Sequence, residues 1–262
     1  MEEQQQLQCE EEQSQPEYGK KVYLYSWLVV LVLFASYGMK SQWQQHIPVR
    51  QVSIEGISII SRDEILRLLS LPQNISMYEL DLSLLQKNIL ANNFVKNVVV
   101  KRDMPNTLRV EIEERIPAAM LVQNNGIFYI DEDGVLLPYA VTKETYDIPV
   151  ISGADSLGNV KTGMVVANAD VRSALEIIRV SKIVSSEMYH AISEIKLRKG
   201  HDIILYSFEN GVPIIFGQGE TAKKLVKLDE FRKRFMQNND VGNLQYIDVR
   251  FDDQVIVSQK NS

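Results

Sequence analysis

The uncharged, apolar run from Val22 to Met39 constrains this chain more than any other feature of its sequence. Eighteen residues without a charge separate Lys21 from Lys40. As a helix they would extend roughly 27 Å, close to the thickness of a bilayer's hydrocarbon core. Trp27 lies within the run, and tyrosines, which favour the membrane interface, lie near both of its ends. The run therefore predicts a single membrane-spanning helix that tethers the rest of the chain.

Two alternatives to a membrane anchor are open for this run. A cleaved secretory signal is the stronger one, because Ser36 and Gly38 are small residues of the kind found around a cleavage site. However, the run exceeds the usual apolar core of about 7–15 residues, and an acidic, glutamine-rich leader precedes it. A helix buried in a globular core seldom needs such a long unbroken apolar run. Basic residues on the two flanks nearly balance, so they do not orient the span.

The leader, residues 1–21, is predicted to be a disordered tail, because its few apolar residues cannot offset the entropy cost of ordering. Its six acidic and two basic residues contribute −4 of the net charge of −6, leaving the rest of the chain near −2. A nucleic-acid-binding domain would carry a concentrated basic face, which this balance argues against. Cys9, the only cysteine, lies in the tail, so no intrachain disulfide braces the remainder.

The segment 48–115 is predicted to fold as a strand, two helices and two strands. A capping box at Ser61 and Glu64 begins the first helix, and Asp81 begins the second. A turn at residues 104–107 then separates two strands with alternating apolar side chains. This order describes a small α+β domain whose helices cover one side of the sheet. The predicted inward residues are Val52, Ile54, Ile65, Leu68, Leu69, Leu82, Leu85, Ile89, Leu90, Val98, Val100, Leu108, Val110 and Ile112.

The segment 116–258 is predicted to be a mostly antiparallel β domain with two helices. Hairpin signals recur at 124–126, 133–134 and 210–211. Asp170 is the expected cap of one helix and Thr221 of the other. The expected inward residues of these helices are Val171, Leu175, Ile178, Leu225, Leu228 and Phe235. Residues 259–262 are predicted to be a polar tail.

The basic residues of the last predicted helix are best interpreted as a solvated face, because Asp229 and Glu230 interrupt them. Attraction of anionic lipid or of an acidic partner is the alternative. The basic residues are Lys223, Lys224, Lys227, Arg232, Lys233 and Arg234.

The sequence offers no constellation that predicts catalysis. His46, His190 and His201 are far apart and lack a metal-binding spacing. Residues 131–133 lack the remaining ligands of a calcium loop, and residues 217–219 are too short for a dinucleotide fingerprint. We therefore predict no enzyme activity, no metal, no cofactor and no small-molecule substrate.

The chain's end predicts a possible docking edge. Tyr246, Asp248, Arg250 and Phe251 belong to a late alternating strand, and a tight turn follows it. A short last strand should lie at a sheet edge, where unpaired backbone groups invite a partner's strand. The alternative is an edge that the domain itself closes, and spacing does not decide between them. The predicted edge residues are Gln254, Val255, Ile256 and Val257.

Several segments, taken in order over residues 20–258, resemble the bacterial division family FtsQ, also called DivIB. These segments are Val52–Gly56, Pro105–Leu108, Glu113–Ala119, Asp131–Gly134, Ile148–Gly153 and Tyr246–Phe251. The resemblance implies a POTRA domain at 48–115 and an FtsQ-type β domain at 116–258. Met104 and Ile57 stand where relatives often have tryptophan and asparagine, so the resemblance implies no individual POTRA contact residues.

The resemblance also implies a function and a location. Proteins of this family are non-enzymatic scaffolds of the divisome that bind FtsB and FtsL through the late strand region, and contact other division proteins through the POTRA domain. The chain is then expected in the inner membrane at the division site, with a cytoplasmic N-terminus and periplasmic domains. A POTRA-containing envelope assembly or secretion component is one alternative, although the sequence lacks the strands of a barrel. A membrane-anchored wall hydrolase is another, although its nucleophile or metal set is missing.

Overall fold

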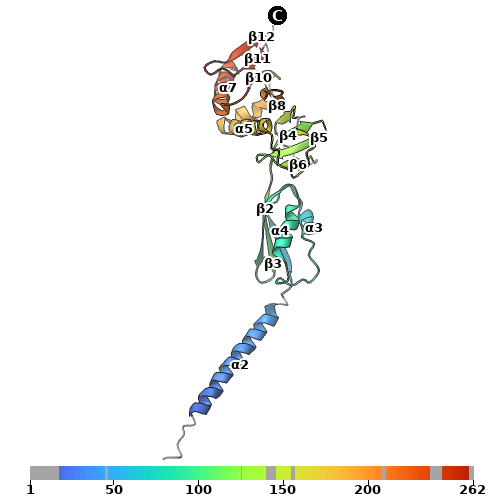
Figure 1. Cartoon of the computed structure of the whole chain (residues 1–262), viewed down its shortest axis with the longest axis vertical. Coiled ribbons are helices and arrows are strands. Elements are labelled where there is room, and N and C mark those ends of the chain that lie inside the picture. Colours follow the sequence, from blue (N-terminus) through green and yellow to red (C-terminus); the bar gives the residue numbers. More distant parts are fainter. Residues whose placement is uncertain are drawn as a thin grey trace, which may run out of the picture. The chain divides into compact units, whose positions relative to one another are not determined.

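The secondary structure of most of the chain is described in a computed structural model (Figure 1). The described residues are 18–44, 47–124, 126–139, 146–154, 157–207, 211–236 and 244–259. Contacts divide the chain into two compact units, and each is described by itself. One unit comprises Met1–Ser53, Leu71–Leu82 and Val100–Arg109, and the other comprises Ile54–Ser70, Ser83–Val99 and Val110–Ser262.

The first unit contains the long helix α2 (Tyr18–Gln44). Its described large apolar side chains between Val22 and Phe34 are all at least half exposed. Within the residues that the structure describes, no helix meets both the length and the hydropathy required to cross a membrane. The side chains of Leu24 and of residues 37–39 lie outside the described ones. The span from Val22 to Met39 therefore stays a prediction.

Short segments of the same unit are tied together by backbone and arginine contacts. The N–H of Val49 donates to the carbonyl of Ile75 at 3.1 Å, and Met77 donates to Ile47 at 2.7 Å. The Nε of Arg102 also donates to the carbonyl of Met77, at 2.8 Å. Residues 47–49 and 75–77 are thereby held side by side.

The predicted order of a strand, two helices and two strands is confirmed. Ser61 caps the first helix as expected, because its Oγ accepts the N–H of Glu64 at 3.2 Å. Leu90 departs from the expected inward face, being 49% exposed at the end of its helix. The strands form a sheet in the order β1-β3-β2. The elements are β1 (Gln51–Glu55), α3 (Arg62–Leu69), α4 (Leu82–Leu90), β2 (Val95–Asp103) and β3 (Thr107–Glu114).

A nine-stranded sheet lies within the second unit, in the order β12-β11-β10-β9-β8-β7-β4-β5-β6. Three of its eight neighbouring pairs are parallel, namely β10–β11, β4–β7 and β7–β8. The other five are antiparallel, so the sheet is mixed but mostly antiparallel, as predicted. The strands are β4 (Pro117–Gln123), β5 (Gly126–Asp131), β6 (Leu136–Pro138), β7 (Val150–Ser152), β8 (Ile192–Arg198), β9 (Asp202–Ser207), β10 (Pro213–Ile215), β11 (Leu244–Asp248) and β12 (Ile256–Gln259).

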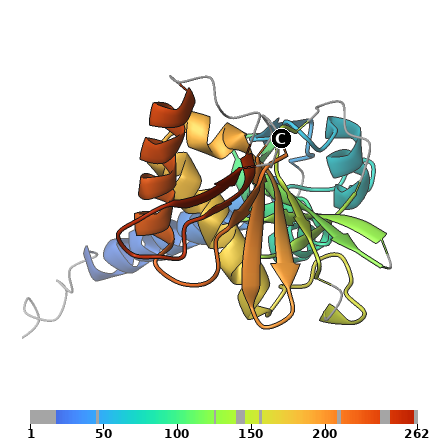
Figure 2. The same cartoon turned by 90° about the horizontal axis from the view of Figure 1, so that it is seen from above.

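The helices explain two of the parallel pairs. Helices α5 (Ala169–Val184) and α6 (Ser186–Ala191) lie between β7 and β8, and α7 (Thr221–Met236) lies between β10 and β11. A helical crossover returns the chain in the same direction and so pairs the two strands in parallel. The short helix α6 was not predicted from the sequence. Figure 2 shows α5 and α7 side by side on one face of the sheet, in agreement with their contacts.

Both expected caps of these helices need correction. Thr221 is the first residue of α7, not the residue before it. Asn168, not Asp170, caps α5, because its Oδ1 accepts the N–H groups of Asp170 at 2.9 Å and of Val171 at 3.1 Å. The predicted inward residues are buried, except that the side chain of Phe235 lies outside the described ones. Buried members of the common core include Leu121, Ile151, Val171, Leu175, Ile195, Leu205, Phe216, Leu225 and Leu228.

Candidate functional site

Strand β12 is the terminal strand of the nine-stranded sheet, as the sequence predicted for the last strand. It pairs antiparallel with β11, with Ile256 opposite Asp248 and Val257 opposite Ile247. In the part of the chain that the structure describes, no strand pairs with the other side of β12. The strand begins at Ile256 and not at Gln254, because residues 251–253 form bends and residues 254–255 carry no strand pairing.

Side chains around β12 alternate between two environments. Val255 and Val257 are partly buried and pack against the hydrophobic core, so their own domain covers part of their surface. Ile256 lies between them and therefore points to the opposite face of the sheet, where it is partly exposed. The side chain that β12 offers on the uncovered face is thus Ile256, flanked by Ser258.

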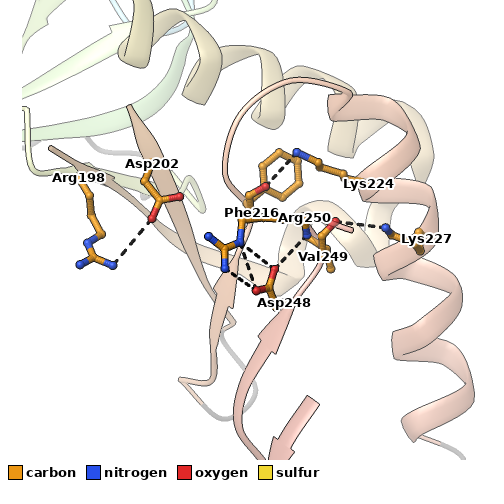
Figure 3. A network of polar contacts seen from close by, with 8 residues as sticks. All are labelled: Arg198, Asp202, Phe216, Lys224, Lys227, Asp248, Val249 and Arg250. Carbon is orange, nitrogen blue, oxygen red and sulfur yellow. Dashed lines mark hydrogen bonds and ion pairs between the residues drawn. The ribbon is translucent and has the colours of Figure 1, made fainter. Parts of the chain in front are cut away.

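Asp248 and Arg250 form a two-point polar contact at the end of β11, the strand that pairs with β12 (Figure 3). The Nε of Arg250 donates to Oδ1 of Asp248 at 3.0 Å, and its Nη2 donates to Oδ2 at 2.7 Å. The side-chain hydrogen bond of Arg250 lowers the pKa of Asp248, whose carboxylate is almost completely buried. The side chain of Arg250 remains 48% exposed, so its positive charge faces solvent.

The stem of Arg250 lies against the backbone of Gly217. A Cβ at this glycine would stand 3.0 Å from both Cγ and Cδ of Arg250, and its φ of +67° disfavours any other residue. Gly217, in the segment that follows β10, therefore leaves room for the stem of Arg250. On neighbouring strands, Figure 3 shows Arg198 paired with Asp202 at 3.9 Å.

Two lysines of α7 donate hydrogen bonds to the segments that follow β10 and β11. The Nζ of Lys224 is buried and donates to the carbonyls of Phe216 at 3.1 Å and Gln218 at 2.6 Å. Burial lowers the pKa of this lysine. The Nζ of Lys227 donates to the carbonyl of Val249 at 3.2 Å and also to that of Phe251. The interpretation of this basic stretch as a solvated face is wrong for these two residues.

A sequence signal for the two lysines does exist. Lys224 and Lys227 are three residues apart and adjoin the buried Leu225 and Leu228, so they lie at the border of the helix's inner face. Their acceptors, however, are backbone carbonyls of distant loops. No pattern of side chains in the sequence indicates which backbone carbonyls accept these hydrogen bonds.

The remaining predicted edge residues take different positions. Tyr246 lies on β11, half-buried and opposite Ser258 of β12. Phe251 is 45% exposed just beyond β11, and Gln254 is exposed before β12. The structure thus gathers the predicted residues at one edge, although the two valines turn toward the core.

The histidines and acidic residues that were weighed for chemistry have structural partners. The Nδ1 of His190 lies 3.1 Å from Oδ2 of Asp147, and that of His201 lies 2.6 Å from Oδ1 of Asp170. Asp131 accepts Nη1 of Arg115 at 2.6 Å. Among the described residues, no group of three or more histidine, cysteine or acidic side chains could hold a metal ion. His46 and Cys9 lie outside the described residues.

Comparisons with known proteins agree with this architecture. Residues 47–115 match the family described as POTRA domain, FtsQ-type, and residues 116–258 match the family described as FtsQ/DivIB, C-terminal related. The cell division protein FtsQ of Geobacter sp. (strain M21) is 29% identical over 79% of this chain and 74% of its own length. That of Geotalea daltonii is 28% identical, covering 80% of this chain and 75% of the relative.

A third relative is covered over a larger share of both chains. The cell division protein FtsQ of Corynebacterium glutamicum is 26% identical over 85% of this chain and 95% of its own length. The matched FtsQ/DivIB C-terminal region alone covers more than half of the chain. The chain therefore belongs to the FtsQ/DivIB family of non-enzymatic bacterial cell division proteins.

Proposed function

We propose that this chain is a divisome scaffold that binds an FtsB-type subunit, together with FtsL, by adding a partner strand to β12. The terminal position of β12 in the sheet carries the proposal. An edge strand presents a row of unpaired N–H and C=O groups, and a partner's backbone can continue the ladder there. Through this contact the chain would couple FtsB and FtsL to septal wall synthesis.

Side chains at the edge would select the partner. Ile256 offers an apolar contact on the uncovered sheet face, and the partly exposed Phe251 offers another just before β12. Arg250, in the segment between β11 and β12, offers a positive charge through its half-exposed guanidinium. Because Val255 and Val257 already pack on the core, we assign them to holding β12 in place.

A membrane anchor in α2 would keep this edge near the septum. At about 1.5 Å per residue, its 27 residues extend roughly 40 Å. The hydroxyls of Ser26 and Ser36 donate to the carbonyls of Tyr23 and Leu33 at 2.8 Å, which lowers the cost of placing them in lipid. Apolar side chains are exposed all round the helix, as a span requires.

The proposed organisation follows from this anchor. We assign residues 1–21 to a cytoplasmic tail whose last four residues begin α2, 22–39 to the span, 48–115 to the POTRA domain, 116–258 to the β domain and 259–262 to a polar tail whose first residue ends β12. The two domains would then lie outside the inner membrane at the division site. The POTRA domain would contact other divisome proteins.

Proline substitutions along β12 test the strand-addition proposal. Successive N–H groups of a strand point to opposite sides, so Ile256 and Ser258 share one side and Val257 has the other. Proline at a residue whose N–H points away from β11 should abolish co-purification with the FtsB-type partner. It should leave thermal unfolding of the chain nearly unchanged. Proline on the inward side removes a ladder bond to β11 and should destabilise the fold. Full co-purification by all three folded variants would contradict strand addition.

A further inference from the structure

The ammonium of Lys227 joins helix α7 to the segment that leads into β12. It donates to the carbonyl of Val249 (Figure 3) and to that of Phe251, two residues further along the chain. Both carbonyls lie within hydrogen-bonding reach of the same ammonium. One ammonium with three donors can therefore serve both, whereas the planar fork of an arginine matches such a pair less closely.

A second lysine one turn earlier contacts the same segment. The Nζ of Lys223 lies 3.4 Å from Oδ1 of Asp252, whose hydrogen bond raises the pKa of the lysine. At the start of the segment, the N–H of Val249 donates to the carbonyl of Ile215 at 3.1 Å. Residues 249, 251 and 252 are thus each held from outside the segment, two of them by Lys227 and one by Lys223.

The path of these residues determines where β12 begins. β11 ends at Asp248, and β12 begins at Ile256. The connecting residues form bends instead of a tight two-residue turn, so the turn itself does not fix the register of the edge strand. The contacts from α7 provide a fixed point between the two strands.

We propose that Lys227 is a positioning residue for the edge strand, with Lys223 in a lesser supporting role. By clamping residues 249–252 to α7, it sets the register and rigidity of β12 before a partner arrives. A preordered edge binds more tightly, because it loses less conformational entropy when the partner associates. The effect on partner affinity rests on the proposed function, whereas the clamp itself does not.

Amide hydrogen exchange of the full-length chain tests the clamp without any partner. In Lys227→Met, which keeps the apolar stem and the helix propensity, exchange across residues 249–259 should accelerate roughly tenfold, the effect expected for losing charge-assisted bonds. Exchange in β4, β5 and α5 should stay unchanged. Lys227→Arg, which keeps the charge and several donors, should recover part of the protection. Arg234→Met removes the same charge two turns away and is the matched control.

The results separate the possible roles of Lys227. Unchanged exchange in Lys227→Met would overturn the clamp. Acceleration throughout the unit would also overturn it, since Lys227 would then be a general stabiliser. If Lys227→Met does not fold, Lys223→Met, at an exposed lysine, is the second variant. It should accelerate amide exchange across residues 249–259 by a smaller factor and leave other segments unchanged.

Affinity for the purified FtsB-type partner tests the consequence for binding. Lys227→Met should weaken it several-fold, chiefly through faster dissociation, while Arg234→Met should not. Local acceleration of exchange with unaltered affinity would leave the clamp standing and count against β12 as the docking edge. Failure of the clamp is therefore distinguishable from failure of the proposed function.

Discussion

Asp248 and Arg250 form a two-point ion pair at the end of β11, in which an almost buried carboxylate meets a half-exposed guanidinium. The backbone N–H of Arg250 adds a third hydrogen bond, to Oδ1 of Asp248 at 3.0 Å. Asp248→Asn keeps the shape and removes the charge. We expect it to lower the free energy of unfolding by about 1–2 kcal/mol, less than for a fully buried pair because solvent screens Arg250. Urea unfolding at neutral pH measures this loss.

The same pair predicts a pH dependence. The pKa of Asp248 is lower when folded than its ordinary value of 3.8, mainly through the side-chain hydrogen bond of Arg250. The unfolded chain therefore binds this proton first as the pH falls, and the stabilisation is lost below pH 3.8. Wild type should lose more stability than Asp248→Asn on acidification through this range. Parallel losses would contradict the assignment, and the exposed Asp253→Asn is the control.

Gly217 and Gly219 form a matched pair, because both have φ of +67° but only Gly217 faces Arg250. Alanine at either position should cost about 1 kcal/mol for its left-handed backbone. Gly217→Ala should also displace Arg250, whose stem would be 3.0 Å from the new methyl group. We therefore expect Gly217→Ala to weaken partner binding and Gly219→Ala to leave it intact. Equal binding by the two folded variants would remove Arg250 from the docking edge.

Local rules predicted much of the fold, because their causes lie within a few residues. Ser61 caps its helix, and the alternating Val98, Val110 and Ile112 are buried. The cap at Asp170 was wrong because the helix begins earlier, at Ala169, and Asn168 accepts the N–H groups of Asp170 and Val171. Competition between adjacent capping residues depends on where the helix begins, which tertiary packing decides.

Features that join distant segments were not predictable in the same way. Both crossover helices were predicted from the sequence. The parallel pairing of the strands that each helix connects was not predicted. The terminal position of β12 was expected, but not the turning of Val255 and Val257 toward the core. Likewise, Lys224 and Lys227 donate to backbone carbonyls, which every residue carries and which leave no trace in the sequence.

Glu114 predicts a stability effect remote from β12. Its carboxylate accepts the backbone N–H groups of Ser58, Ile59 and Ile60 at 2.8–2.9 Å, and the Oγ of Ser58 at 2.9 Å. Glu114→Gln replaces one acceptor oxygen with a donor that faces these N–H groups. We expect a loss of about 1–3 kcal/mol in urea unfolding. Glu113→Gln, at an exposed neighbour, should change stability by less than about 0.5 kcal/mol, and similar losses in both would refute the contribution of Glu114.

The anchor proposed in α2 makes a separate prediction about membrane insertion. Leu31 lies at the middle of the run from Val22 to Met39, where lysine costs about 2.5–3.5 kcal/mol on insertion scales. Full-length wild type should resist extraction of membranes with alkaline carbonate, and Leu31→Lys should shift a measurable fraction into the extract. Tyr23→Lys is the control, because a lysine near the end of a span can reach the headgroups. Complete extraction of wild type would contradict an uncleaved anchor. So would an intact mass that matches a chain whose first residue follows Gly38.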